Sequence, residues 1–192
     1  GRHGAAEKVS LICIDEPERL SLRLVYVTGG AMAVPVKLKV MAYITHGSRL
    51  LVFREPDFPD AGIQVPGGSV AAGERLEVAV MREAFEETGL KGLSLGTYLG
   101  DVKHDLSALH AENRSDFSPL GRPEIHHRHY YHLMVAGDVP ESWQHAERDP
   151  SEGVHESILF EFTWVQLPDC VPRLMGLRDE KIPELIAELG YS

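Results

Sequence analysis

The sequence has few cysteines and no long apolar segment. Its 192 residues include only Cys13 and Cys170, which is too few for the disulfide framework of a small secreted domain. No run reaches the roughly eighteen apolar residues that a transmembrane helix needs, and the first residues lack the charged and then apolar pattern of a secretory signal. These features favour a reducing compartment, so we predict a cytoplasmic protein that makes no membrane contact.

Basic side chains are scarce as well. The sequence has 19 Lys and Arg against 29 Asp and Glu, a formal net charge of −10. A surface with this average charge repels nucleic acid backbones and anionic membranes, so no nucleic acid polymer is expected as a partner. A small anionic substrate is compatible with it, because bound cations can reverse the sign of the charge locally.

The hydrophobic content is that of an ordinary globular domain. Apolar residues make up 43% of the chain, enough for one folded domain with an appendage. The first strong strand pattern begins at Val36. We therefore predict a domain over residues 34–192, which includes a C-terminal helix, and an N-terminal extension over residues 1–33. Two interpretations of the extension stay open: it lies outside the fold, or it adds a hairpin to the sheet.

Alternating apolar residues and turn-forming residues predict the order of the elements. Strands are expected at residues 36–45, 50–53, 63–65, 93–102, 125–136 and 157–165. Loops are expected at residues 55–62, 104–123 and 137–155, and helices at residues 74–88, which Gly89 ends, and 181–189. A central helix between two groups of strands indicates a mixed α/β fold rather than a regular β-α-β alternation.

The most informative segment is residues 68–90, GSVAAGERLEVAVMREAFEETGL. On a helix with about 100° per residue, Glu83, Glu86 and Glu87 lie on one face, because they are three and four residues apart. The large apolar side chains fall on the opposite side, and we predict that the helix buries that side: Val78, Met81 and Phe85.

A helix face rich in glutamate is most often simply solvated. Here Arg82, four residues before Glu86, relieves only part of the negative charge. A cluster of carboxylate oxygens suits a hard cation such as Mg²⁺, which binds oxygen ligands and substrate phosphates. Gly67 and Gly68 precede the helix, and glycine lets the backbone approach an ion or a ligand closely. The segment therefore predicts a divalent metal site.

The spacing of the whole segment distinguishes it from an ordinary acidic helix. It fits the pattern G-x5-E-x7-R-E-U-x-E-E-x-G-U, in which U is aliphatic, and the matching residues are Gly68, Glu74, Arg82, Glu83, Ala84, Glu86, Glu87, Gly89 and Leu90. This pattern is the Nudix box, so the sequence resembles the Nudix hydrolases. The resemblance implies an α/β/α sandwich built on a mixed β-sheet, with the box as a loop–helix–loop.

The resemblance also implies an activity. Nudix hydrolases cleave a diphosphate linkage in nucleoside diphosphate derivatives or similar small metabolites, which implies Mg²⁺ as the cofactor here, with Mn²⁺ as the alternative ion. Carried over by position, metal binding falls to Gly67, Gly68, Glu83, Glu86 and Glu87. Gly67 or Gly68 would offer a backbone carbonyl, and the three glutamates their carboxylates.

Further roles follow from the same resemblance. Arg82 would orient the glutamates for catalysis, and Glu74 would stabilise the junction of loop and helix. The general base stays open between Glu83 and an acid from a later loop, such as Glu124, Glu152 or Glu156. The homodimer that is common in such families also stays open.

Two other functions are compatible with the same scaffold. One is an isomerase, but the isomerases that resemble this family pair the fold with a catalytic cysteine, and neither Cys13 nor Cys170 lies near the box. The other is a non-catalytic metabolite sensor. Sensors often lose box glutamates, whereas this sequence keeps every one. Hydrolysis is therefore the preferred prediction.

A second stretch rich in functional side chains spans residues 126–132. On a strand its alternating residues face opposite sides, with His127 and His129 on one side and His126 and His132 on the other. A zinc site needs three or four converging ligands, and this alternation divides the set, so a partly exposed strand is the preferred interpretation. The candidates for contacts with substrate are Arg54, Arg128 and Tyr130.

Overall fold

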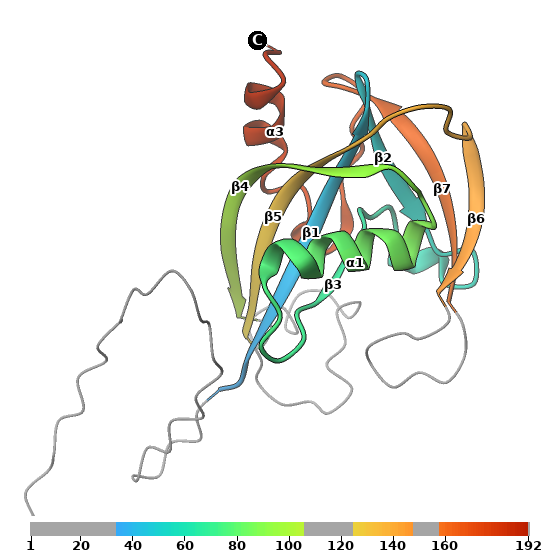
Figure 1. The fold of residues 1–192 in the computed structure, drawn as a ribbon. Coiled ribbons are helices and arrows are strands. Elements are labelled where there is room, and N and C mark those ends of the chain that lie inside the picture. Colours follow the sequence, from blue (N-terminus) through green and yellow to red (C-terminus); the bar gives the residue numbers. More distant parts are fainter. Residues whose placement is uncertain (1–33, 106–124, 148–157, 192) are drawn as a thin grey trace, which may run out of the picture.

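The computed structural model describes residues 34–105, 125–147 and 158–191 (Figure 1). The predicted extension over residues 1–33 lies outside the described residues, as do Glu124, Glu152 and Glu156. The elements in chain order are β1 (Val36–His46), β2 (Arg49–Arg54), the 3₁₀ helix η1 (Pro59–Ala61), β3 (Gly67–Ser69), α1 (Leu76–Thr88), β4 (Leu93–Asp105), β5 (Ile125–Val135), β6 (Ser142–Glu147), β7 (Ile158–Gln166), η2 (Met175–Leu177) and α3 (Ile182–Glu188).

The strands form one mixed sheet of seven. Six follow the order β4-β5-β1-β2-β7-β6, and the short β3 pairs with β1 beside them. β1 and β5 run parallel, whereas the other pairs are antiparallel. Helices α1 and α3 lie on opposite sides of the sheet (Figure 1). The predicted α/β class and the three-layer arrangement are thus confirmed.

Each face of the sheet buries its own hydrophobic core. Because side chains alternate along a strand, Val40 and Ala42 of β1 face α1, while Met41 and Tyr43 face α3. The core under α1 includes Ala79, Val80 and Ala84 of that helix, and the core under α3 includes Ile182 and Leu185. On β5, odd-numbered and even-numbered residues therefore face opposite cores. This division determines which side chains of β5 lie on the same side of the sheet.

Helix α1 begins two residues later than predicted and ends where Gly89 was expected to end it. Gly89 adopts the left-handed conformation at φ 67°, and its N–H donates to the carbonyl of Phe85 at 2.8 Å. A residue without Cβ is favoured in that conformation. The predicted C-terminus of the helix is therefore confirmed.

The predicted buried face of α1 is wrong for two of its three residues, because only Met81 is partly buried and packs against the core under the helix. Val78 and Phe85 are 54% and 51% exposed. The face that packs on the sheet instead carries small and acidic side chains, namely Ala79, Val80, Glu83, Ala84, Glu87 and Thr88. Small side chains let the helix approach the sheet closely, and the hydrogen bonds described below compensate the buried carboxylates.

Two strands also differ from the sequence-based prediction. The predicted strand at residues 63–65 is reduced to a single bridge between Phe53 and Gln64, and the glycines expected to end it form β3. Strand β6 lies inside the predicted loop at residues 137–155, where it pairs with β7. Within the described residues, neither helix has the length and apolar character needed to span a bilayer.

Candidate functional site

Three of the four box glutamates, Glu83, Glu86 and Glu87, lie on α1 next to strand β3. Glu83 and Glu87 are 2% and 7% exposed, whereas Glu86 is exposed. The Gly67 N–H donates to Glu87 Oε2 at 3.0 Å. The face of the helix that carries negative charge is thus turned toward the glycine strand, and Glu86 lies at its solvent edge.

Gly67 and Gly68 allow this close packing of strand and helix. A Cβ on Gly68 would lie 2.2 Å from the carboxyl carbon of Glu83, and a Cβ on Gly67 would lie 2.4 Å from the carbonyl oxygen of Val40. Real Cβ atoms do not approach other heavy atoms so closely, so any larger residue would displace a carboxylate or a backbone segment. The structure therefore brings both predicted glycines to the box glutamates.

Arg82 connects the glutamates with one another. Its Nη1 donates to Glu83 Oε1 and to Glu86 Oε2, both at 3.0 Å. Its Nη2 donates to the Ser69 carbonyl at 3.1 Å. A rigid guanidinium with five donors suits such a task, because it holds several acceptors at fixed angles.

Glu74 holds Arg82 in place from the other side. Arg82 Nε and Nη2 donate to Glu74 Oε1 and Oε2 at 2.9 and 2.8 Å, and the N–H of Ala71 donates to Glu74 Oε2 at 2.9 Å. The hydrogen bonds from Arg82 hold the pKa of the Glu74 carboxyl below its ordinary value. Glu74 therefore ties the loop before α1 to the first turns of the helix, as predicted for the loop–helix junction.

The electrostatics of the cluster suit a cation. Burial raises the pKa of Glu83, an effect that Arg82 partly opposes and the neighbouring Glu86 reinforces. A carboxylate offers about four lone-pair positions, so the contacts with Arg82 leave coordinating capacity on Glu83 and Glu86. This set of oxygen donors around one guanidinium fits a hard divalent ion, which prefers oxygen ligands.

The three predicted substrate-binding residues do not join this cluster. Arg54 ends β2 and forms an ion pair with Glu161 of β7, with its own side chain 68% exposed. Arg128 is buried on the α3 face and donates to the Gly176 carbonyl. Tyr130 is fully buried on the same face, and its hydroxyl donates to the Leu177 carbonyl at 3.3 Å.

The expectation that residues 126–132 form a partly exposed strand is wrong for most of the stretch. His132, for example, is 2% exposed, with Nε2 2.8 Å from the Thr45 hydroxyl and Nδ1 3.0 Å from Glu188 Oε1. The predicted division of the stretch between two faces is confirmed, because Tyr130 belongs to the core under α3 and Tyr131 to the core under α1.

Two residues of β6 contact the end of the box helix, and the sequence analysis did not assign either of them to the site. The Trp143 indole N–H donates to the Thr88 carbonyl at 2.9 Å, and His145 Nε2 lies 3.1 Å from the Glu86 carbonyl. Both contacts satisfy carbonyls in the last turns of α1, where no helical partner remains. The two residues share a face of β6 because they are two positions apart, but residues 137–155 were predicted as a loop, so no local signal in the sequence identifies them.

The comparisons with known proteins agree with this architecture. The NUDIX domain family model matches residues 36–185. No curated protein matches the sequence. Among solved structures, the MutT protein from Methanosarcina mazei Go1 is similar, with a TM-score of 0.54 and 20% identity over 83% of this chain and 99% of that chain. The E. coli ORF135 protein has a TM-score of 0.50 and 17% identity over 84% of this chain and 96% of that chain. At these low sequence identities the two structures support the fold alone.

Proposed function

The chain belongs to the NUDIX domain family, and we propose that it hydrolyses a diphosphate linkage in a nucleoside diphosphate derivative or a similar small metabolite, using Mg²⁺. Nudix hydrolases act on small phosphorylated substrates and generally use a divalent metal. The chain is accordingly a Nudix-type pyrophosphohydrolase. Beyond this family membership, we propose the identity of the ion, which is Mg²⁺ with Mn²⁺ as the alternative. We also propose the substrate class and the roles of individual residues.

One arrangement supports the proposal above all others. Glu83, Glu86 and Glu87 lie on consecutive turns of α1 beside the glycine strand, and Arg82 holds the first two through one nitrogen. A solvated acidic face would not bury two of its three carboxylates. Burial of like charges is costly unless cations share the site. The single guanidinium of Arg82 also pairs with Glu74, which leaves excess negative charge, so we assign the metal to this place.

Each box residue then has a defined task. The carboxylates of Glu83, Glu86 and Glu87 would hold the ion, together with a backbone carbonyl of Gly67 or Gly68. Bound Mg²⁺ would neutralise the diphosphate, polarise the phosphorus and lower the pKa of a water molecule. Arg82 keeps two of the carboxylates at fixed positions, which reduces the reorganisation needed when substrate binds.

A proton must also leave the attacking water. Glu83 is the candidate within the described residues, because burial raises its pKa and so makes it a stronger base than an ordinary carboxylate. The other candidates are the acids Glu124, Glu152 and Glu156. Comparing the pH profile of turnover in Glu83→Gln with the profiles of the three loop variants would assign the base.

The substrate proposal is tested with the full chain and a panel of nucleoside diphosphate derivatives. We expect release of a phosphorylated product only when Mg²⁺ or Mn²⁺ is present. Formation of an isomer without hydrolysis would instead favour the isomerase, for which Cys170, exposed after β7, is a poor candidate nucleophile because it lies outside the box. Tight binding without turnover would favour a sensor.

The residue assignment is tested with Glu86→Gln and Glu87→Gln. Loss of a group that merely orients a metal ligand already costs about 10–100-fold in activity, so loss of a ligand should lower turnover at least that far. Glu77→Gln is the matched control, because Glu77 lies in the first turn of the same helix and is 42% exposed. Circular dichroism would show that each variant keeps its fold. Full activity in either box variant would refute the assignment.

The cell compartment is also part of the proposal. With two cysteines in 192 residues, the chain has the composition of a protein from a reducing environment. We propose the cytoplasm, where small phosphorylated metabolites are abundant. Its acidic surface argues against a nucleic acid polymer as the substrate.

A further inference from the structure

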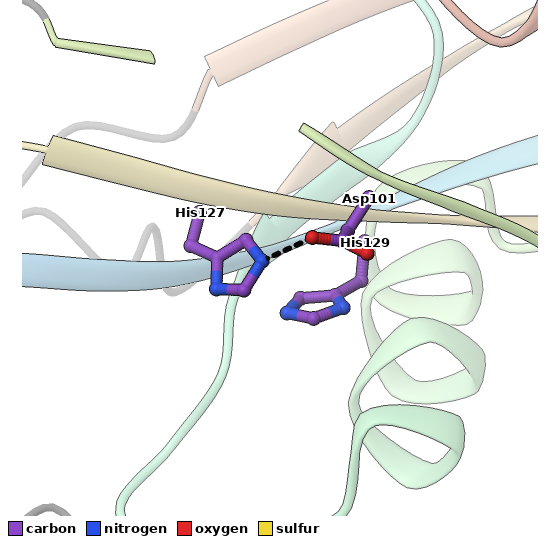
Figure 2. A group of neighbouring side chains, drawn as sticks. All are labelled: Asp101, His127 and His129. Carbon is purple, nitrogen blue, oxygen red and sulfur yellow. Dashed lines mark hydrogen bonds and ion pairs between the residues drawn. The ribbon is translucent and has the colours of Figure 1, made fainter. Parts of the chain in front are cut away.

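A second group of metal-ligating side chains lies on the sheet and shares no residue with the box. Asp101 of β4 lies opposite His129 of β5, and His127 is two residues away on the same face of β5. One ligand atom from each of the three lies within 4.8 Å of the other two. Figure 2 shows the three side chains gathered in one small region, with a dashed line between His127 and Asp101. The non-local partner Asp101 supplies the ligand that the histidine stretch alone lacks.

The hydrogen bonds of the cluster determine which nitrogen of His129 carries a lone pair. The Tyr98 hydroxyl donates its single hydrogen to Asp101 Oδ1 at 3.1 Å, because a carboxylate only accepts. The same hydroxyl oxygen lies 3.0 Å from His129 Nδ1, so it accepts the hydrogen from that nitrogen. His129 Nε2 is therefore unprotonated, with its lone pair available to an ion.

Among the described residues, His129 Nε2 makes no hydrogen bond that would stabilise the fold. The residue is 7% exposed, and among the described residues this nitrogen has no hydrogen-bond partner although it is buried. Buried polar atoms in native proteins are nearly always satisfied. The rings of His127 and His129 are 4.2 Å apart between centroids, so the unsatisfied atom belongs to the same compact group.

We propose that Asp101, His127 and His129 bind a divalent transition-metal ion, most simply Zn²⁺. Two imidazole nitrogens and one carboxylate oxygen are typical ligands of zinc and its first-row neighbours, whereas Mg²⁺ prefers oxygen alone. The box offers oxygen ligands and this cluster mainly nitrogen. The two sites therefore select different classes of ion.

The ligand atoms of the cluster lie within 4.8 Å of one another, so those that are farthest apart have to approach by up to about 1.4 Å to bind one tetrahedral ion, and the closest pair has to separate. His127 Nε2 lies 2.6 Å from Asp101 Oδ2, and the metal would replace the hydrogen shared by these two atoms. Two ligands bound at about 2.0–2.1 Å to a tetrahedral ion are about 3.4 Å apart, so the pair has to separate by less than about 1 Å. The side chain of Asp101 is 45% exposed, which leaves a route for the ion and a place for water as the fourth ligand.

Titration of the full chain with Zn²⁺, after removal of metals by a chelator, tests the proposal by calorimetry. We expect one binding event that His129→Ala and Asp101→Asn each weaken at least about tenfold, since even a partner that only orients a ligand contributes that much. Tyr98→Phe, which removes such an orienting partner, should also weaken it by about 10–100-fold. His126→Ala is the matched control, because it removes a neighbouring histidine from the other face of β5.

Co²⁺ gives a second readout that does not depend on variants folding well. In the intact chain we expect the visible absorption of four-coordinate Co²⁺, lost in His129→Ala and kept in Glu86→Gln. A spectrum that stays that of the hydrated ion would overturn the proposal. So would equal weakening by His126→Ala and His129→Ala, which would indicate adventitious binding to a histidine-rich strand. Loss of the signal in Glu86→Gln would place the ion at the box instead.

Discussion

Arg82 and Glu74 form a bidentate ion pair that joins the loop before α1 to the helix itself. Nε and Nη2 of the arginine donate to the two carboxylate oxygens at 2.9 and 2.8 Å. Such planar, bidentate pairs are stronger and more directional than contacts of a lysine ammonium. The remaining nitrogen of the guanidinium contacts Glu83 and Glu86, so the geometry of the proposed metal ligands depends on this pair.

Arg82→Lys should therefore lower both stability and turnover. A lysine keeps the charge but cannot bind two oxygens of Glu74 and contact two further carboxylates at once. Because the arginine is 32% exposed and the glutamate 13%, we expect a loss of about 1–2 kcal/mol in the free energy of unfolding. Urea unfolding measures the loss.

Arg75→Lys is the control for this substitution. Arg75 precedes the same helix and pairs with Glu77 at 3.5 Å, but it is 79% exposed. An exposed pair of this kind contributes little, so a change within about 0.5 kcal/mol is expected. Equal effects of the two substitutions would show that the bidentate geometry has no energetic consequence.

The same ion pair predicts how stability depends on pH. Arg82 holds the pKa of Glu74 below its ordinary value of 4.5, so the folded state binds the proton less tightly than the unfolded state. The stabilisation is present in full above the ordinary pKa and is lost as the pH falls through the lowered value. The difference in unfolding free energy between wild type and Glu74→Gln should be largest near pH 7 and shrink below about pH 4.

Glu77→Gln, measured at both pH values, reports the general effect of removing one negative charge from this acidic protein. If the difference for Glu74→Gln grew on acidification, the sign of the argument would be wrong. A difference that stayed constant would mean that the carboxylate charge makes no contribution through Arg82.

Much of this architecture could be predicted from local patterns. Strands with clear alternation, such as β1 and β5, and the glycine that ends α1 follow from side-chain periodicity and backbone sterics. The spacing of the box alone predicts that Glu83, Glu86 and Glu87 share one face of a helix. These features depend on neighbours close in sequence, which is why they could be predicted.

The buried face of α1 could not be predicted in that way. Large apolar side chains are the usual sign of a buried face, but Val78 and Phe85 are exposed. The helix instead packs through Ala79 and Ala84, and Glu83 beside them is buried because Arg82 and the glycine strand accommodate its carboxylate. The proposed metal site accounts for this departure from the hydrophobic pattern, because its carboxylates would have to face inward.

The partners contributed by distant strands were also beyond local reasoning. β6 is a short, polar strand that pairs with β7 alone in the sheet order, so nothing in its own composition separates it from a loop. Asp101 meets His129 only through the register of β4 on β5, and that register shifts twice, between Leu95 and Tyr98 and between Tyr98 and Gly100. Contacts of this kind follow from the assembled sheet and not from any one segment.

Gly68→Ala should disturb catalysis through a single methyl group. The new Cβ would lie 2.2 Å from the carboxyl carbon of Glu83, so the carboxylate has to move. A displacement of about 1 Å in a catalytic group can cost about 100-fold in rate, and we expect a loss of that order in kcat/KM together with weaker activation by Mg²⁺. Ser69→Ala, the next residue of β3, is the control and should stay near wild type. Unchanged turnover in Gly68→Ala would mean that the position of Glu83 is not critical.

Gly89→Ala should destabilise the fold by more than its backbone conformation alone explains. At φ 67° an alanine costs about 1 kcal/mol relative to glycine, and its Cβ would also lie 2.9 Å from the ring of His145. Gly190→Ala is the matched control, since its φ is 76° but nothing lies within 4 Å of the added Cβ. Thermal unfolding should therefore show a larger loss for Gly89→Ala.

The double variant Gly89→Ala/His145→Ala should recover part of that excess, because the clash disappears while the backbone cost remains. His145→Ala alone is the reference, because it also removes the contact with the Glu86 carbonyl. If Gly89→Ala cost as much in that background as in wild type, the contact with His145 would not be the cause.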